Sequence, residues 1–196
     1  ILGTLLQHTG MNLYYLAQEG FLRGAYQESI GPTLLGLEHP DLGETERYQL
    51  YCMAGVMCAD HVKKRKYLGR GITLCPTRRE AYGHLATVLI DEGNFSEAVR
   101  LLNLVEMLPR PQGVIWNLDA KWYGHLPKML IEQCLRAVGQ TADADRCVRE
   151  SFRQNWGQIT MVFNGPFMDC FRLHKFFVDT SDNPAAIQAL FITPYE

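Results

Sequence analysis

Two aspartates near the end of the chain have a spacing that can bind a divalent metal ion. Asp143-Ala-Asp145 is a D-x-D pattern, in which both carboxylates can reach one ion when they end a strand. Here the pattern follows Gly139-Gln-Thr141, which predicts the start of a helix instead. Acidic side chains in a first helical turn interact favourably with the helix dipole. We therefore interpret these aspartates as helix-start residues and not as metal ligands.

Cysteine and histidine also occur at ligand-like spacings. The C-x-x-H and C-x-x-x-H pairs offer two ligands each, whereas a structural zinc site needs four; the pairs are Cys58 with His61 and Cys170 with His174. The chain contains no G-x-S-x-G elbow and no phosphate-binding P-loop. We therefore predict no catalytic residue, no metal and no cofactor in this segment.

The densest group of aromatic and polar residues lies in one short stretch. Such residues can form a pocket for a ligand or partner, because aromatic side chains dominate interface hot spots. They can equally pack between two helical elements, since large aromatics mostly lie in cores. The packing interpretation is favoured, and the binding interpretation stays open for Trp116, Asp119, Trp122, Tyr123 and His125.

Basic residues offer two further candidates. Arg78 and Arg79 stand at a predicted helix start, where they can bind an acidic group of a partner or act as solvated charges that pair with Glu80 or Asp60. The run Lys63–Lys66, with Arg70, is typical of the solvated face of a helix. It has no aromatic platform for bases, so we predict no nucleic-acid binding.

Composition limits the classes of protein. The 196 residues carry a net charge of −2, which argues against nucleic-acid and anionic-membrane partners because these require a positive field. No apolar run has the roughly 18–20 residues of a membrane helix, and no signal peptide begins the chain. The six cysteines fit small buried apolar residues in a reducing compartment, so we predict a cytoplasmic protein without a membrane partner.

The elements that position these residues are predicted to be helices. Between residues 79 and 109, apolar residues recur at helical spacing in two segments that are separated by Gly93. Thr77 with Glu80 and Asn94 with Glu97 have the spacing of helix-capping pairs. Gly93 is expected to end the first helix. The segment therefore predicts a pair of amphipathic helices that Pro109 closes.

The same pair recurs along the chain. Closing prolines at 40, 76 and 109 are 36 and 33 residues apart, which fits a repeating unit of about 34 residues. The predicted repeats span about 12–40, 44–76, 79–109 and 116–155. In the first repeat, Gly24 matches Gly93. The second repeat lacks the turn glycine, and the fourth departs furthest from the pattern, with Gly139 between its two helices.

This order of residues resembles the tetratricopeptide repeat. Tyr82, then Leu85 and Ala86, then Ala98 stand where that repeat has an aromatic, a leucine and two small residues. The resemblance implies an all-α fold in which helical hairpins stack as a superhelix with a concave binding face. First-helix residues would line this face, which adds Tyr48, Tyr82 and His84 to Arg78, Arg79 and the 116–125 segment as candidate binding residues.

A more specific resemblance rests on the segment that opens the third repeat. Pro76-Thr-Arg-Arg-Glu80, followed by the aromatic stretch from Val114 to Tyr123, resembles the repeat regions that follow the catalytic domain of some family 2 glycosyltransferases. It implies that a catalytic domain using a nucleotide sugar and a divalent metal precedes Ile1. The chain begins with isoleucine, which also predicts a longer protein.

The sequence thus predicts a repeat domain over residues 1–156 and a short mixed tail over 157–196. The tail contains apolar segments, Ile159–Phe163 and Phe176–Val178, that resemble short strands. The predicted function is a module that binds a protein or peptide, orients an acceptor for the catalytic domain of the same chain, or self-associates. Two alternatives remain: a free-standing adaptor, and a sugar-nucleotide-dependent transferase in its own right.

Overall fold

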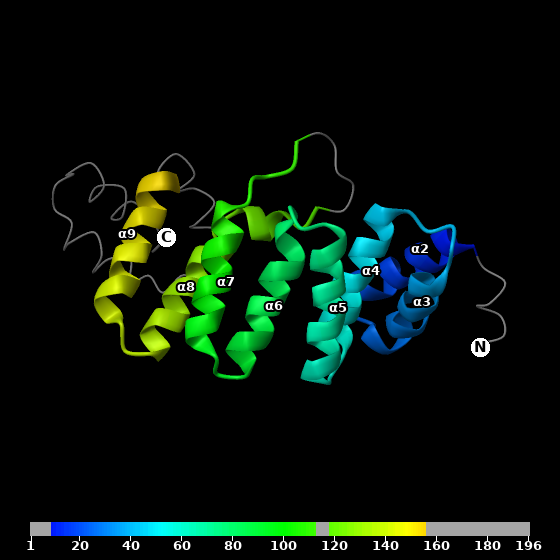
Figure 1. Ribbon diagram of the computed structural model, residues 1–196, viewed down its shortest axis with the longest axis horizontal. Helices are drawn as coiled ribbons and strands as arrows, with labels where there is room; N and C mark the ends of the chain where they lie inside the picture. The colour runs from blue at the N-terminus through cyan, green and yellow to red at the C-terminus, as the bar shows by residue number, and fades with distance from the viewer. Residues whose placement is uncertain (1–8, 113–117, 156–196) are drawn as a thin grey trace, which may run out of the picture. The chain divides into compact units, whose positions relative to one another are not determined.

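The computed structural model describes residues 9–112 and 118–155, and within these ranges it contains helices and no strand (Figure 1). Trp116 and the predicted tail, with both strand-like segments, lie outside the described residues. In chain order the helices are α2 (Gly10–Leu22), α3 (Tyr26–Glu38), α4 (Glu44–Met57), α5 (His61–Leu74), α6 (Arg79–Asp91), α7 (Phe95–Met107), the 3₁₀ helix η1 (Ala120–Tyr123), α8 (Leu126–Ala137) and α9 (Thr141–Asn155).

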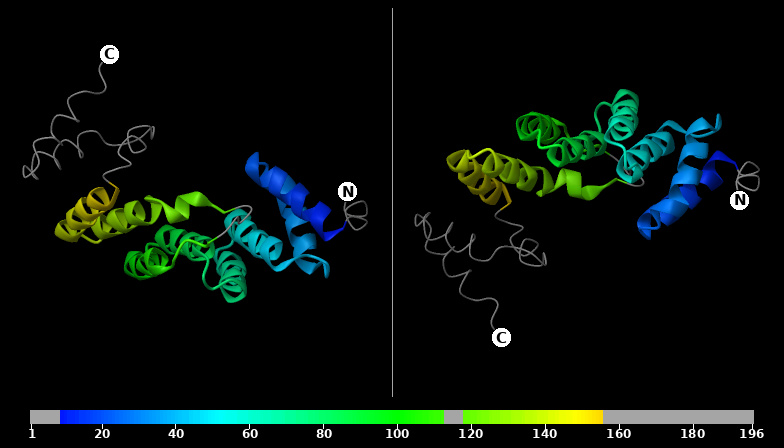
Figure 2. Two further views of the ribbon diagram at one scale, coloured as in Figure 1. Left: turned by 90° about the horizontal axis from the view of Figure 1, so that it is seen from above. Right: turned by 90° about the horizontal axis from the view of Figure 1, so that it is seen from below.

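From α2 to α8 the helices pack in the order in which they follow one another. Each helix packs on the next, and η1 lies against both α6 and α8 (Figures 1 and 2). The first helices of neighbouring pairs also touch, α2 with α4 and α4 with α6. The prediction of an all-helical, repeat-like arrangement is therefore confirmed for the described residues. None of these helices has the length and apolar character that crossing a bilayer requires.

Three of the four predicted pairs turn in the same way. Gly24, Gly93 and Gly139 all have φ between 73° and 79°, a left-handed conformation that glycine adopts without strain. At Gly93, the amides of Gly93 and Asn94 donate to the carbonyls of Ile90 and Leu89, and equivalent bonds form at the other two glycines. This is a Schellman ending, as the predicted turn glycines required.

The second pair turns differently because it has no such glycine. Cys58 ends α4 in an extended conformation. Asp60 then begins α5, and its carboxylate accepts a hydrogen bond of 2.8 Å from the Val62 amide. The second pair therefore lacks the turn glycine, as predicted, and uses a different turn that the Asp60 side chain caps.

The two predicted capping pairs of the third repeat do not form. The N-cap of α6 is Arg78, one residue after Thr77, and the Glu80 side chain is occupied by other partners described below. The N-cap of α7 is Asn94, but its side chain makes no cap hydrogen bond and its amide group donates to Glu92 instead. Spacing predicted where both helices begin but not which atoms satisfy their free amides.

The fourth pair differs from the expected continuous helix over about 116–138. Instead, η1 ends at Tyr123, Gly124 adopts a non-helical conformation with ψ of −141°, and α8 begins at Leu126. Pro127 lies in the first turn of α8, where its missing amide proton costs nothing. The break turns the aromatic stretch into a separate short element that can contact α6.

Close helix contacts depend on residues without large side chains. The residue five positions after each turn glycine is fully buried, namely Ser29, Ala98 and Ala144. A Cβ atom on Gly36 would lie 2.7 Å from Leu50, and one on Gly55 would lie 2.5 Å from Leu68. A Cβ atom on Gly83 would overlap the indole ring of Trp122. These glycines therefore form the slots into which the large side chains of neighbouring elements fit.

The Gly83 slot gives a direct test of this packing. Gly83→Ala should lower the free energy of unfolding by about 1–3 kcal/mol, because the new methyl group must displace the Trp122 ring. Gly69→Ala is the matched control, since a Cβ atom at Gly69 in α5 meets open space. Urea titration should show the control unchanged or stabilised by about 0.5–1 kcal/mol through helix propensity. Equal stability of the two variants would contradict the slot.

Candidate functional site

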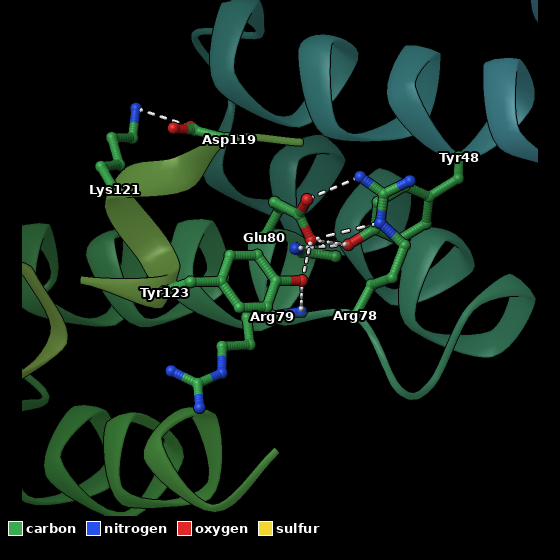
Figure 3. Close-up of polar contacts among 8 residues, drawn as sticks. Tyr48, Arg78, Arg79, Glu80, Asp119, Lys121 and Tyr123 are labelled. Atoms are coloured by element: carbon green, nitrogen blue, oxygen red, sulfur yellow. Dashed lines mark hydrogen bonds and ion pairs between the residues drawn. The ribbon is translucent and has the colours of Figure 1, made fainter. Parts of the chain in front are cut away.

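Several of the residues singled out by the sequence meet around one buried carboxylate, that of Glu80. Glu80 lies in the first turn of α6 and is 2% exposed, Arg78 is 6% exposed and Tyr48 is 0% exposed. Tyr48 comes from α4 and Tyr123 from η1, and in Figure 3 they approach Glu80 from opposite sides. We refer to Tyr48, Arg78, Glu80 and Tyr123 as the Glu80 cluster.

Four hydrogen bonds satisfy the Glu80 carboxylate. Arg78 donates from Nη2 to Oε1 at 2.6 Å and from Nε to Oε2 at 3.3 Å. The hydroxyls of Tyr48 and Tyr123 donate to Oε2 at 3.2 Å and 3.0 Å (Figure 3). Two-point contact with a guanidinium and further hydroxyl donors is the arrangement that a buried carboxylate needs.

The two tyrosine hydroxyls also accept hydrogen bonds from the start of α6. The Ala81 amide donates to Tyr48 at 3.0 Å and the Arg79 amide donates to Tyr123 at 3.1 Å. These amides belong to the first turn, which has no intrahelical acceptor. The cap of α6 is therefore supplied by side chains of α4 and η1, and not by the predicted Thr77–Glu80 pair.

Arg79 satisfies free backbone carbonyls at the end of α7. Its guanidinium donates from Nε to the Leu108 carbonyl at 2.7 Å, and from Nη2 to the Glu106 carbonyl at 3.1 Å. A further bond of 3.3 Å reaches the carbonyl of Trp122 in η1. The carbonyls at a helix C-terminus carry partial negative charge, so a cation there is stabilising.

Electrostatics keep Tyr48, Tyr123 and Arg78 of this cluster protonated. Burial raises the pKa of Tyr48 far above its ordinary value and raises that of Tyr123 to about 12. Burial acts to lower the pKa of Arg78, but the hydrogen bond and attraction to Glu80 outweigh it and the pKa is raised. The guanidinium also lies over the Tyr48 ring, with Cζ 4.2 Å from the ring centroid.

Beside this cluster, Trp122 and His84 form a second contact between η1 and α6. Trp122 is 2% exposed, and its ring meets the His84 ring edge to face at a centroid distance of 5.2 Å. Lys121 Nζ lies 5.9 Å from the centroid of the Trp122 ring. Burial and then repulsion from Lys121 lower the pKa of His84 to about 3, although part of its surface remains exposed. His84 is therefore neutral at physiological pH.

The other candidate residues lie apart from the Glu80 cluster. Tyr82 is half-buried and its hydroxyl donates to the Pro76 carbonyl at 3.1 Å. Asp119 forms an ion pair of 2.9 Å with Lys121, separate from the cluster (Figure 3). His125 is exposed before α8. Three candidates were expected on an accessible concave surface, but Tyr48, Arg78 and Trp122 are buried and cannot contact a partner directly.

The remaining sequence candidates are placed as follows. Asp143 lies in the first turn of α9, as expected, and Asp145 binds Arg136 at 2.7 Å. The residues Lys63, Arg65, Lys66 and Arg70 are exposed on α5. Within 9–112 and 118–155, no three His, Cys, Asp or Glu side chains are grouped to hold a metal ion. Cys170 and His174 lie outside the described residues.

The arrangement favours a structural role over a catalytic one. Glu80 is 2% exposed and both of its oxygens accept hydrogen bonds from the chain itself, so a substrate cannot reach this carboxylate. The raised pKa values of the two tyrosines disfavour phenolate nucleophiles. The chemistry of the cluster is therefore the mutual neutralisation of buried groups, which joins α4, α6 and η1.

The sequence indicated Glu80 as a possible partner of the two arginines, and the Arg78–Glu80 pair forms, but Glu80 was not predicted to be buried at the centre of a cluster. One signal was present: two arginines and a glutamate lie at a helix start, and the repeats before and after this one contain tyrosines.

Comparison with known proteins adds no identification to this geometry. No protein-family model matches the chain, and no curated protein matches its sequence. The tetratricopeptide and glycosyltransferase resemblances therefore stay predictions that rest on the residues themselves.

The histidine beside Trp122 gives a pH-dependent prediction. The pKa of His84 is about 3 in the folded state and 6.5 in the unfolded state. Neutral His84 therefore stabilises the fold fully above pH 6.5, and this stabilisation is lost as the pH falls toward 3. Between pH 7 and 5, wild type should lose about 2 kcal/mol more unfolding free energy than His84→Gln. His125→Gln is the surface control and should behave as wild type. Equal losses in wild type and His84→Gln would contradict the placement of this ring.

Proposed function

We propose that this chain is a tetratricopeptide-like interaction module and the accessory part of a family 2 glycosyltransferase. The observation that carries the proposal is that the charged residues at the start of α6 bind other parts of the chain itself. The polar groups of Arg78, Arg79 and Glu80 form hydrogen bonds within the chain, and these bonds join neighbouring helical elements. A segment built this way is a scaffold that presents a surface.

The repeat character is supported by features that recur at equivalent positions. The same left-handed turn occurs at Gly24, Gly93 and Gly139, and a fully buried small residue follows five positions later each time. First helices of neighbouring pairs touch, α2 with α4 and α4 with α6. Stacking of such pairs into a superhelix, with first helices on the concave side, would follow from this regularity.

The partner-facing residues of this proposal are the candidates that keep accessible surface. His125 is exposed, and the half-buried candidates are Arg79, Tyr82, His84, Asp119 and Tyr123. They come from α6 and from the stretch around η1, which the Glu80 cluster holds against α6. A rigid platform of this kind loses little conformational entropy when a partner binds.

The link to a glycosyltransferase rests on the Pro76–Glu80 segment and the aromatic stretch that ends at Tyr123. These two segments contact each other through the Tyr123–Glu80 and Tyr123–Arg79 bonds. An accessory module of this class would orient an acceptor for a catalytic domain of the same protein. A free-standing adaptor would use the same surface for a separate partner.

Lysine-directed cross-linking of the natural full-length protein distinguishes these outcomes. The accessory function predicts cross-links from Lys121 and Lys128 to a catalytic domain of the same chain, and these should diminish in Asp119→Ala/His125→Ala. Asp41→Ala/His39→Ala, between α3 and α4, is the matched control. Cross-links to a different protein would favour the adaptor.

The transferase alternative is tested by titrating the isolated chain with UDP-N-acetylglucosamine and Mn²⁺ in a calorimeter. We expect no saturable binding. Binding that disappears in Asp143→Asn/Asp145→Asn would overturn the proposal, because it would show that this chain carries its own donor site.

A further inference from the structure

The outward face of α5 carries three cations in a row. Leu68 and Gly71 are buried in the face of this helix that packs on α4 and α6. Lys63, Lys66 and Arg70 are exposed, and their spacing of three and four residues places them together on the opposite face of the helix. We refer to these three residues as the α5 basic face.

The charge of this face is not balanced by the part of the chain that the structure describes. The helix contains five lysine and arginine residues and no acidic one, although the whole chain has a net charge of −2. Arg65 lies on another side of α5 and pairs with Glu92 of the neighbouring helix pair. Within residues 9–112 and 118–155, no carboxylate forms an ion pair with Lys63, Lys66 or Arg70.

The arrangement works against the stability of α5 itself. Lys63 lies in the first turn, near the positive end of the helix dipole, where a cation is unfavourable. Like charges three and four residues apart, as in Lys63 with Lys66 and Lys66 with Arg70, also repel each other. Among the described residues no contact offsets these costs, and local arrangements that oppose stability are expected at functional surfaces. A partner that neutralises the face accounts for it.

We propose that the α5 basic face binds an acidic segment of a partner protein. Along the helix axis, Lys63 and Lys66 are about 4.5 Å apart, and Lys66 and Arg70 are about 6 Å apart. Side chains on alternate residues of an extended segment recur about every 6.6–6.8 Å. A run of about six acidic residues can therefore place carboxylates beside all three cations. Such charge complementarity fixes the position of the partner and speeds its association.

Two other anionic partners fit this face less well. Val62 and Thr73 are the exposed neutral side chains beside the cations, so the face offers no aromatic ring on which nucleic-acid bases could stack. An anionic bilayer is held stably by a larger basic cluster or by an apolar insertion, and the single valine provides neither. A short acidic polypeptide segment matches both the number and the spacing of the cations.

The inference deepens the proposed function, since it rests on the chain being an interaction module and names a class of partner. It uses a different surface from the one around Asp119 and His125 that the cross-linking experiment examines. The two experiments change no residue in common. A failure of one is therefore distinguishable from a failure of the other.

The test is a titration of the whole chain with a fluorescent oligoglutamate peptide of about six residues at low ionic strength. We expect saturable binding that is absent with oligoglutamine of the same length. Affinity should fall as NaCl rises, because the contacts are ionic and exposed. In Lys66→Glu/Arg70→Glu, affinity should fall by about tenfold or more, since two attractions become repulsions.

Arg23→Glu/Arg110→Glu is the matched control. Both arginines are exposed, at the end of α2 and after α7, and the double variant changes the net charge by the same amount as the α5 variant. The control should bind oligoglutamate as wild type does, because the site is local to α5. Circular dichroism of both variants checks that each is folded before its affinity is interpreted.

Three results would overturn the proposal. The first is the absence of saturable oligoglutamate binding to wild type. The second is an equal loss of affinity in the two double variants, which would show that binding follows net charge and not the α5 basic face. The third is tighter binding of phosphatidylserine vesicles or of oligothymidylate than of oligoglutamate, lost in Lys66→Glu/Arg70→Glu, which would assign the face to a membrane or to nucleic acid.

Discussion

A buried carboxylate requires compensation from several donors at once, and the Glu80 side chain receives it from three parts of the chain. Arg78 supplies the opposite charge, and tyrosines of α4 and η1 supply hydroxyls. Each tyrosine also caps an amide at the start of α6. Removing any member would leave another polar group buried without a partner, so the elements are fixed relative to one another.

Polar backbone groups at the helix ends also need partners, and two other arginines supply them. Arg47 donates to the carbonyls of Leu37, His39 and Leu42, where α3 ends and the chain enters α4. Arg79 does so where α7 ends. In a chain of helix pairs every helix end brings unpaired backbone groups close to a neighbour, and long arginine side chains can reach them. Other polar residues, among them the basic residues of α5, then remain exposed on the surface.

The fold was largely predictable because periodicity and turn glycines act locally. The helix pairs, the glycine turns at 24, 93 and 139, and the missing glycine after α4 all followed from spacing. Glu80 was assigned to a local cap because its two tyrosine partners, Tyr48 and Tyr123, are 32 and 43 residues away in sequence. The break before α8 and the Gly83 slot for Trp122 also depend on tertiary contacts that no local pattern encodes.

The most direct test of the Glu80 cluster is the free energy of unfolding of Glu80→Gln at pH 7. Glutamine keeps the shape of the side chain but removes its charge, which leaves Arg78 buried and uncompensated. We predict a loss of about 3–5 kcal/mol relative to wild type. Glu97→Gln, an exposed change in α7, should alter stability by less than about 0.5 kcal/mol. A Glu80→Gln variant as stable as this control would contradict the claim that one buried carboxylate holds α4, α6 and η1 together.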